Sequence, residues 1–318
     1  MAIDQDIRKV LGNVLSQPPV NAVNSTVAEL RRNTEELELK YDLPEVSMYQ
    51  ERSLDIAGPA GPVPVRLYWP RKLGRDERIP VVVFMHGGAW VFCSMDTHEN
   101  MLRYLCGKAD AIGVNVGYRL APEHKFPTAL EDCYAVLEWT ERHVELIGGR
   151  PDRVSVAGDS AGGNLAAVLC LLARDRNGPD IAAQLLFYPS VAAGVLPRYP
   201  SWNTYVAGSI QDFEAEISVL LDYYLDSSGE LKDYRVSPVL ADRHDDLPPA
   251  LIITAEYDSF RDDGAVYADK LASSGVSVEH KCFDGAVHAF MSLAGGMSRG
   301  YEALDYTAEY LRKSNTGS

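Results

Sequence analysis

Ser160 stands between two glycines, in the stretch Gly-Asp-Ser-Ala-Gly that runs from Gly158 to Gly162. A β-branched run precedes this stretch and an apolar helical pattern follows it, so the sequence predicts a strand that turns sharply into a helix at the serine. In so tight a turn, a side chain at either glycine would collide with a neighbouring strand or helix. Gly-x-Ser-x-Gly at such a joint is typical of a serine that acts as a nucleophile.

A serine hydroxyl is a weak nucleophile until a base takes its proton, so a histidine oriented by a carboxylate must accompany it. Asp258 and His288 each follow an apolar run that predicts a strand, and the chain order is serine, acid, histidine. We therefore predict that Ser160 is the nucleophile, His288 the general base and Asp258 the orienting acid. Asp284, which precedes a glycine turn, remains the alternative acid.

Negative charge develops on the carbonyl oxygen when a serine attacks an acyl group, and preorganised N–H donors at that point are worth roughly 2.7–4 kcal/mol each. The loop His86-Gly87-Gly88-Ala89 follows another predicted strand and exposes backbone N–H groups. A helix that begins beside the serine contributes the N–H of Ala161. We predict an oxyanion hole formed by Gly88, Ala89 and Ala161.

Apolar strand patterns alternate with amphipathic helical patterns along most of the chain, which predicts an α/β fold with right-handed crossovers. The expected strands are 52–58, 62–70, 80–85, 112–118, 153–158, 182–189, 249–258 and 276–285; the expected helices are 99–109, 129–149, 164–176, 264–275 and 301–313. We predict a mostly parallel sheet of about eight strands with helices on both faces. In such a sheet, ligands gather at the carboxyl ends of the strands.

Composition excludes several other classes of protein. The 318 residues carry a formal net charge of −15, which disfavours a nucleic-acid partner because phosphate binding requires a Lys/Arg surplus. The longest apolar runs are too short to span a bilayer, and the N-terminus lacks the apolar core of a signal peptide, so we expect no integral membrane segment and a cytoplasmic location. The five cysteines form no Cys-x-x-Cys pair, which favours free core thiols over disulfides or a metal site.

Five segments carry a family resemblance: HGGAW (86–90), YRLAPEHKFP (118–127), GDSAGGN (158–164), EYDSFRDDG (256–264) and GAVHAF (285–290). Together they resemble the hormone-sensitive-lipase-like esterases (bacterial family IV) of the α/β-hydrolase fold, from about Arg52 to the C-terminus. The resemblance implies a carboxylesterase that hydrolyses short acyl esters through a Ser-His-Asp triad and a covalent acyl-enzyme, needs no cofactor and has a helical cap. It assigns the same roles to Ser160, His288 and Asp258, and makes His86 a residue that stabilises the loop of Gly87 and Gly88.

The chain departs from the family pattern at two positions. Ala89 stands where the family often has a third glycine; its N–H is retained, but its methyl group is expected to restrict bulky substrates. Gly117 replaces a common aspartate, which removes a polar contact near the oxyanion loop. In the segment that follows, we expect Arg119 and Glu123 to form an internal ion pair.

The resemblance also implies how the chain is divided. Residues 1–45 and 195–240 are expected to form the two parts of a helical cap, and residues 46–194 and 241–318 the catalytic domain. Aromatic residues of the cap and of the oxyanion loop are candidate walls of the substrate pocket: Trp90, Trp202, Tyr205 and Phe213.

Three other functions remain open. An amidase or deacetylase would use the same triad. A hormone receptor of this fold would bind a small ligand without turnover, although the receptor branch of the family lacks the histidine that this chain has at His288. A scaffold protein would expose a large apolar patch and no reactive serine. The expected partner is a small ester, and an exposed strand at 276–283 would allow a homodimer.

Overall fold

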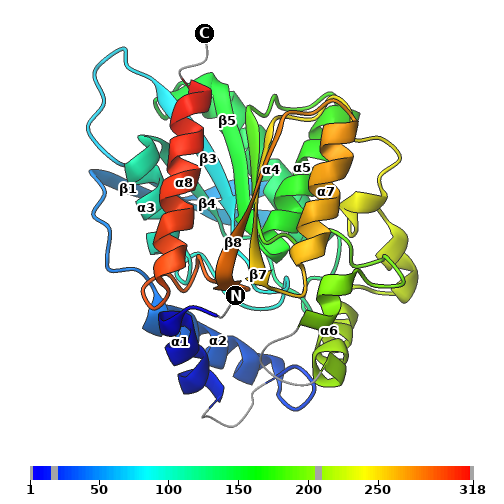
Figure 1. Cartoon of the computed structure of the whole chain (residues 1–318). Helices are drawn as coiled ribbons and strands as arrows, with labels where there is room; N and C mark the ends of the chain where they lie inside the picture. Colours follow the sequence, from blue (N-terminus) through cyan, green and yellow to red (C-terminus); the bar gives the residue numbers. More distant parts are fainter. Residues whose placement is uncertain (1–2, 16–20, 205–209, 316–318) are drawn as a thin grey trace.

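A computed structural model describes residues 3–15, 21–204 and 210–315, and within them the chain forms a sheet of eight strands (Figure 1). The strands are β1 (Gln50–Gly58), β2 (Gly61–Trp69), β3 (Ile79–Met85), β4 (Ile112–Val116), β5 (Gly149–Asp159), β6 (Ala183–Phe187), β7 (Ala250–Tyr257) and β8 (Val278–Val287). Their order is β1-β2-β4-β3-β5-β6-β7-β8, and β2 runs antiparallel to both β1 and β4, whereas the other neighbours are parallel. The predicted α/β fold, strand number and mostly parallel sheet are confirmed.

Helices cover both faces of the sheet. The helices are α1 (Gln5–Leu15), α2 (Val27–Tyr41), α3 (Glu99–Ala109), α4 (Thr128–His143), α5 (Ala161–Arg176), α6 (Ile210–Tyr224), α7 (Arg261–Ser273) and α8 (Ser298–Asn315), with short 3-10 turns at Pro200–Thr204, Ser228–Lys232 and Pro238–Leu240. Helices α3 and α8 pack on one face, and α4, α5 and α7 on the other.

Alternation along the strands builds two cores at once. In β3, Val81 and Val83 belong to the core under α4, α5 and α7, whereas Val82 and Phe84 face the core under α3 and α8. Successive side chains of a strand point to opposite faces, so a run such as Val81–Phe84 must be covered on both sides. Burial on both faces fixes the position and direction of each central strand between the two layers of helices. It therefore also fixes the position of the residue at the carboxyl end of the strand.

Helices α1, α2 and α6 gather at the end of the molecule to which the parallel strands point (Figure 1). They lie within the segments 1–45 and 195–240 that were predicted to form the cap; the domain boundaries themselves stay a prediction. In the described part of the chain, no helix combines the length and the apolar character that crossing a bilayer requires. Among the same residues, no group of His, Cys, Asp and Glu is placed to hold a metal ion.

The predicted ion pair between Arg119 and Glu123 is wrong. The guanidinium of Arg119 instead contacts both carboxylate oxygens of Asp132, at 2.7 and 2.8 Å. Asp132 is fully buried in α4, and a buried carboxylate must be paired and hydrogen-bonded to be tolerated. Glu123 instead pairs with Arg31 of α2 at 2.6 Å, which ties α2 to the segment between β4 and α4.

Candidate active site

Ser160 lies at the joint between β5 and α5, with a backbone φ of 52° that residues with side chains seldom adopt. The two flanking glycines make this turn possible. A Cβ atom at Gly158 would lie 2.3 Å from the carbonyl oxygen of Gly162, and one at Gly162 would lie 2.0 Å from the carbonyl oxygen of Met85. The Ser160 amide donates to the carbonyl of Phe187 at 2.8 Å, which fixes the strained turn against β6.

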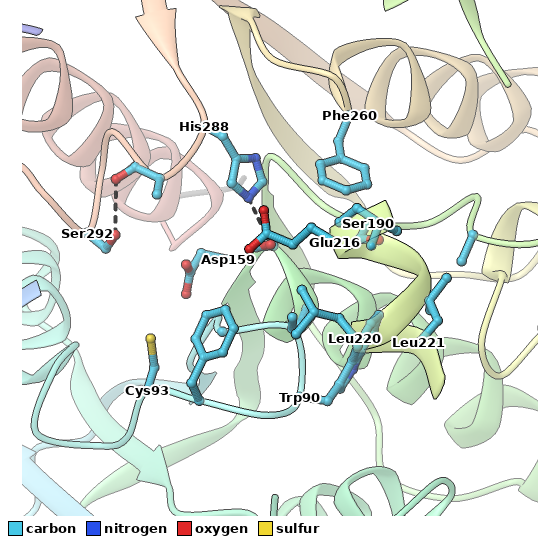
Figure 2. A pocket seen from close by; sticks show the side chains of 18 of the residues that line it. Trp90, Cys93, Asp159, Ser190, Glu216, Leu220, Leu221, Phe260, His288 and Ser292 are labelled. Atoms are coloured by element: carbon cyan, nitrogen blue, oxygen red, sulfur yellow. Dashed lines mark hydrogen bonds between the residues drawn. The ribbon is translucent and has the colours of Figure 1, made fainter. Parts of the chain in front are cut away.

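Ser160, His288 and Asp258 lie in one hydrogen-bonded row (Figure 2 shows His288 of this row). Nε2 of His288 is 2.9 Å from Oγ of Ser160, and Nδ1 is 2.8 Å from Oδ2 of Asp258. The second carboxylate oxygen of Asp258 accepts the backbone N–H of Phe260 at 2.8 Å, which sets the orientation of the carboxylate. The three residues come from the ends of β5, β7 and β8. In the sheet, β7 and β8 are neighbours, and β6 separates β5 from β7.

The surroundings of His288 hold its pKa above the ordinary value of 6.5. Burial alone lowers the pKa, but the charge of Asp258 and its hydrogen bond raise it more, and Asp159 and Glu38 raise it further. Asp258 is almost fully buried, so solvent screens its charge little. The alternative acid, Asp284, lies exposed on β8. The structure therefore brings Asp258, and not Asp284, to the histidine.

Hydrogen bonds from side chains and to a carboxylate fix the backbone of the loop that follows β3. Nδ1 of His86 donates to the carbonyl of Gly87 at 2.7 Å, and the hydroxyl of Tyr118 donates to the carbonyl of His86 at 2.7 Å. The Gly87 amide donates to the carboxylate of Asp159 at 2.8 Å. Burial lowers the pKa of His86 to about 3, so this ring stays neutral and acts as a fixed donor.

Gly88 and Ala89 both adopt left-handed φ values, 107° and 50°. At Gly88 a glycine is required, because a Cβ atom there would lie 2.1 Å from the carbonyl oxygen of Phe92. The amides of Val91 and Phe92 both donate to the carbonyl of Gly88, which turns the loop back on itself. Gly88, Ala89, Ser160 and Ala161 all line one cavity. The three residues predicted as donors thus border the same cavity as the serine, and their role as donors stays a prediction.

The cavity above Ser160 has a volume of about 240 Å³, below the roughly 300–1,000 Å³ of typical small-molecule sites. Three of the four predicted aromatic walls line it, namely Trp90, Trp202 and Phe213; the fourth, Tyr205, lies outside the described residues. Trp90 stacks on Tyr224 at 4.2 Å, so it is fixed from behind by the end of α6.

Three charged side chains near the cavity, those of Glu38, His98 and Asp159, were not predicted from the sequence as residues of the site. All three are buried and line the cavity. His98 donates from Nδ1 to Thr97, whose own hydrogen goes to the Ser94 carbonyl, and its Nε2 lies 3.3 Å from Asp159. This arrangement requires both ring nitrogens to carry hydrogen. Although burial opposes it, Asp159 raises the pKa of His98 to about 9.

Comparisons with known proteins identify the family to which the chain belongs. A model of the α/β hydrolase fold matches residues 82–292. The carboxylesterase NlhH of Mycobacterium tuberculosis is 40% identical over 298 residues, which cover 91% of this chain and 90% of that protein. An arylesterase of Saccharolobus solfataricus is 32% identical over 291 residues, 92% of this chain and 93% of that protein.

Solved structures show the same likeness over the full length. The hyperthermophilic esterase from the archaeon Pyrobaculum calidifontis superimposes with a TM-score of 0.90 at 32% identity, covering 100% of both chains. The thermostable carboxylesterase EstE1 from a metagenomic library gives a TM-score of 0.85 at 38% identity, covering 93% of this chain and 99% of that one. The chain therefore belongs to the α/β-hydrolase fold family, in the hormone-sensitive-lipase-like group that its motifs resemble.

Proposed function

We propose that the protein is a carboxylesterase that hydrolyses short-chain acyl esters through Ser160, His288 and Asp258. The observation that carries the proposal is the row of two hydrogen bonds, 2.9 and 2.8 Å long, that joins Asp258 to His288 and His288 to Ser160; the histidine and the serine line the cavity. The names of the relatives, esterase and carboxylesterase, support the reaction type. The small cavity supports a short substrate.

In the proposed mechanism, Oγ of Ser160 attacks the carbonyl carbon of the ester while Nε2 of His288 takes the hydroxyl proton. The developing oxyanion accepts hydrogen bonds from the amides of Gly88, Ala89 and Ala161. His288 then returns the proton to the alcohol as the carbon–oxygen bond breaks, which leaves the acyl group on Ser160. Water attacks the acyl-enzyme with the same base, and the acid is released.

Asp258 acts through His288 rather than on the ester. Its carboxylate holds the hydrogen of the imidazole on Nδ1, so the lone pair of Nε2 faces the serine. It also stabilises the imidazolium that forms after proton transfer, because a buried opposite charge lowers the free energy of the charged ring.

The proposal is tested with p-nitrophenyl esters from acetate to long acyl chains, hydrolysed by the wild type and by Ser160→Ala. We expect turnover to be highest for short chains and to fall by roughly 10⁴-fold or more in the variant. Equal turnover by the two proteins contradicts the proposal. A matched p-nitroanilide series measures the amidase alternative, which is favoured only if the anilides are cleaved as fast as the esters.

A further inference from the structure

The side chains that line the cavity lie on two sides of His288 (Figure 2). On the mainly apolar side lie Leu220, Leu221 and Phe260, together with Ser190 and Glu216. On the other side lie Cys93, Asp159 and Ser292. The apolar side suits the hydrocarbon part of an ester. The polar side needs a separate explanation, because burying a polar group without a hydrogen bond costs free energy.

Glu38 belongs to this polar side and is the group whose hydrogen bonds are incomplete. Its side chain comes from α2, is only 6% exposed and lines the cavity. Oε1 lies 3.5 Å from Oγ of Ser292, and that hydroxyl already donates to the carbonyl of Ala289 at 3.0 Å. Oε2 has no hydrogen-bond partner among the described residues. Glu38 therefore carries a buried acceptor without a hydrogen bond in the wall of the cavity where we expect the substrate to bind.

The neighbouring charges decide what Glu38 can accept. Burial, Asp159 and Asp42 raise its pKa to about 7, whereas His98 opposes this. A protonated Oε1 donates to Ser292, which leaves Oε2 as a carbonyl oxygen; after ionisation Oε2 is still an acceptor. The positive charge of His98 beside it disfavours an ammonium group on the substrate. A neutral donor, a hydroxyl, fits both protonation states.

We propose that Glu38 is a specificity-determining residue that accepts a hydrogen bond from a hydroxyl group of the substrate, so the natural substrates are short hydroxylated esters. This inference rests on the proposed esterase function and names its substrate class. Glu38 and Ser160 line the same small cavity, and the charge of Glu38 acts on His288, so one short ester that carries a hydroxyl group is expected to contact both residues. An ester without a hydroxyl leaves the buried acceptor unpaired, and sites of this kind discriminate against such substrates.

The test compares three esters under one set of conditions near neutral pH: ethyl butyrate, ethyl 3-hydroxybutyrate and 2-hydroxyethyl butyrate. Titration of the released acid gives kcat/KM for the wild type, Glu38→Met and Glu38→Gln. We expect the wild type to prefer at least one hydroxylated ester about tenfold, the size of one hydrogen bond. Glu38→Met abolishes the preference, and Glu38→Gln, which keeps an acceptor oxygen, retains it. The ester that is preferred shows whether the hydroxyl belongs to the acyl or to the alcohol part.

Glu216→Gln is the matched control, because Glu216 on α6 also lines the cavity but has a hydrogen bond from the backbone of Ala22. It replaces a carboxyl group of the same cavity by the same amide, and we expect it to leave the preference unchanged. Equal preference in the wild type and Glu38→Met overturns the inference. If Glu38→Met does not fold, a wild type that cleaves ethyl butyrate as fast as both hydroxylated esters overturns it. A wild type that cleaves none of the three esters contradicts the proposed function instead.

Discussion

Nδ1 of His288 lies 2.8 Å from Oδ2 of Asp258, and the two residues follow the neighbouring parallel strands β8 and β7. The pair determines which protonation state of His288 is present at a given pH. A general base must be neutral to take a proton, and the pKa of His288 is raised above 6.5. If His288 is the general base, as proposed, we expect the rate of ester hydrolysis to increase with pH through a midpoint above 6.5.

Asp258→Asn removes the charge that raises the pKa of His288. We expect kcat to fall by about 10⁴-fold and the acid midpoint of the kcat/KM profile to move to lower pH. The profile from acid to alkaline pH, measured with a short p-nitrophenyl ester, checks both effects. Asp284→Asn is the control and keeps the wild-type rate and midpoint, since Asp284 is exposed. A large loss in the Asp284 variant and none in the Asp258 variant would reverse the assignment of the acid.

Gly162→Ala places a Cβ atom 2.0 Å from the carbonyl oxygen of Met85, so the strand or the helix must move. We expect the free energy of unfolding to drop by roughly 1–3 kcal/mol or more, and esterase activity to drop with it. Urea unfolding measures the change. Gly107→Ala, on α3, is the control: the nearest described atom is 3.8 Å away, so the substitution stabilises the protein by about 0.5–1 kcal/mol. Equal free energies of unfolding for Gly162→Ala and Gly107→Ala would contradict the close contact between Gly162 and Met85 in the turn at Ser160.

His98→Gln breaks a buried ion pair with Asp159. The pKa of His98 is about 9 in the folded state, above the ordinary 6.5, so the pair stabilises the protein fully below pH 6.5 and this contribution disappears as the pH rises through 9. We expect the variant to lose about 3–5 kcal/mol near pH 6 and much less above pH 9. Urea unfolding of the wild type and the variant, near pH 6 and above pH 9, measures this difference. His124→Gln is the control at an exposed position, and we expect it to change the free energy of unfolding by no more than about 0.5 kcal/mol. A loss at His98 that is the same at both pH values would argue against a charged His98 ring.

For Glu38→Gln, we expect the difference in stability from the wild type to grow as the pH rises, the opposite of the trend for His98→Gln. The pKa of Glu38 is about 7 in the folded state against 4.5 ordinarily, so the wild type loses stability as the pH rises from 4.5 to 7. The glutamine does not titrate, so the variant becomes more stable than the wild type by up to roughly 3 kcal/mol at pH 8. The advantage vanishes below pH 4.5. Thermal unfolding across this range measures it, with the exposed Glu36→Gln of the same helix expected within about 0.5 kcal/mol of wild type at every pH.

The sequence predicted the sheet well because its central strands are buried on both faces and therefore apolar throughout. Val81–Phe84 of β3 is such a run, and its burial admits few other interpretations. Helix ends were less predictable: the helical pattern expected over 129–149 ends at His143 in the structure, because residues 144–148 turn to enter β5. The positions of the loop residues at strand ends could be predicted from the alternation of strand and helix patterns, because this alternation shows where each strand ends.

The charged residues behind the cavity could not be predicted in the same way. Glu38 lies in a highly charged helix, and a buried carboxylate there looks like any surface residue until the helix is packed. One signal was available: Glu38 is eight positions after the buried Leu30 and so lies on the same face of α2. For His98 no local signal exists, because its partner Asp159 is 61 residues away in the sequence.

The reaction of Ser160 with an organophosphate ester tests the central claim most directly. Diethyl p-nitrophenyl phosphate transfers its diethylphosphoryl group to a nucleophilic serine as p-nitrophenolate leaves, and mass spectrometry of the digested protein locates the group. We predict one equivalent of p-nitrophenolate and a modified peptide that carries Ser160, with neither in Ser160→Ala and with a much slower reaction in His288→Gln. A label on another residue, or equal labelling of the Ser160→Ala protein, would contradict the account.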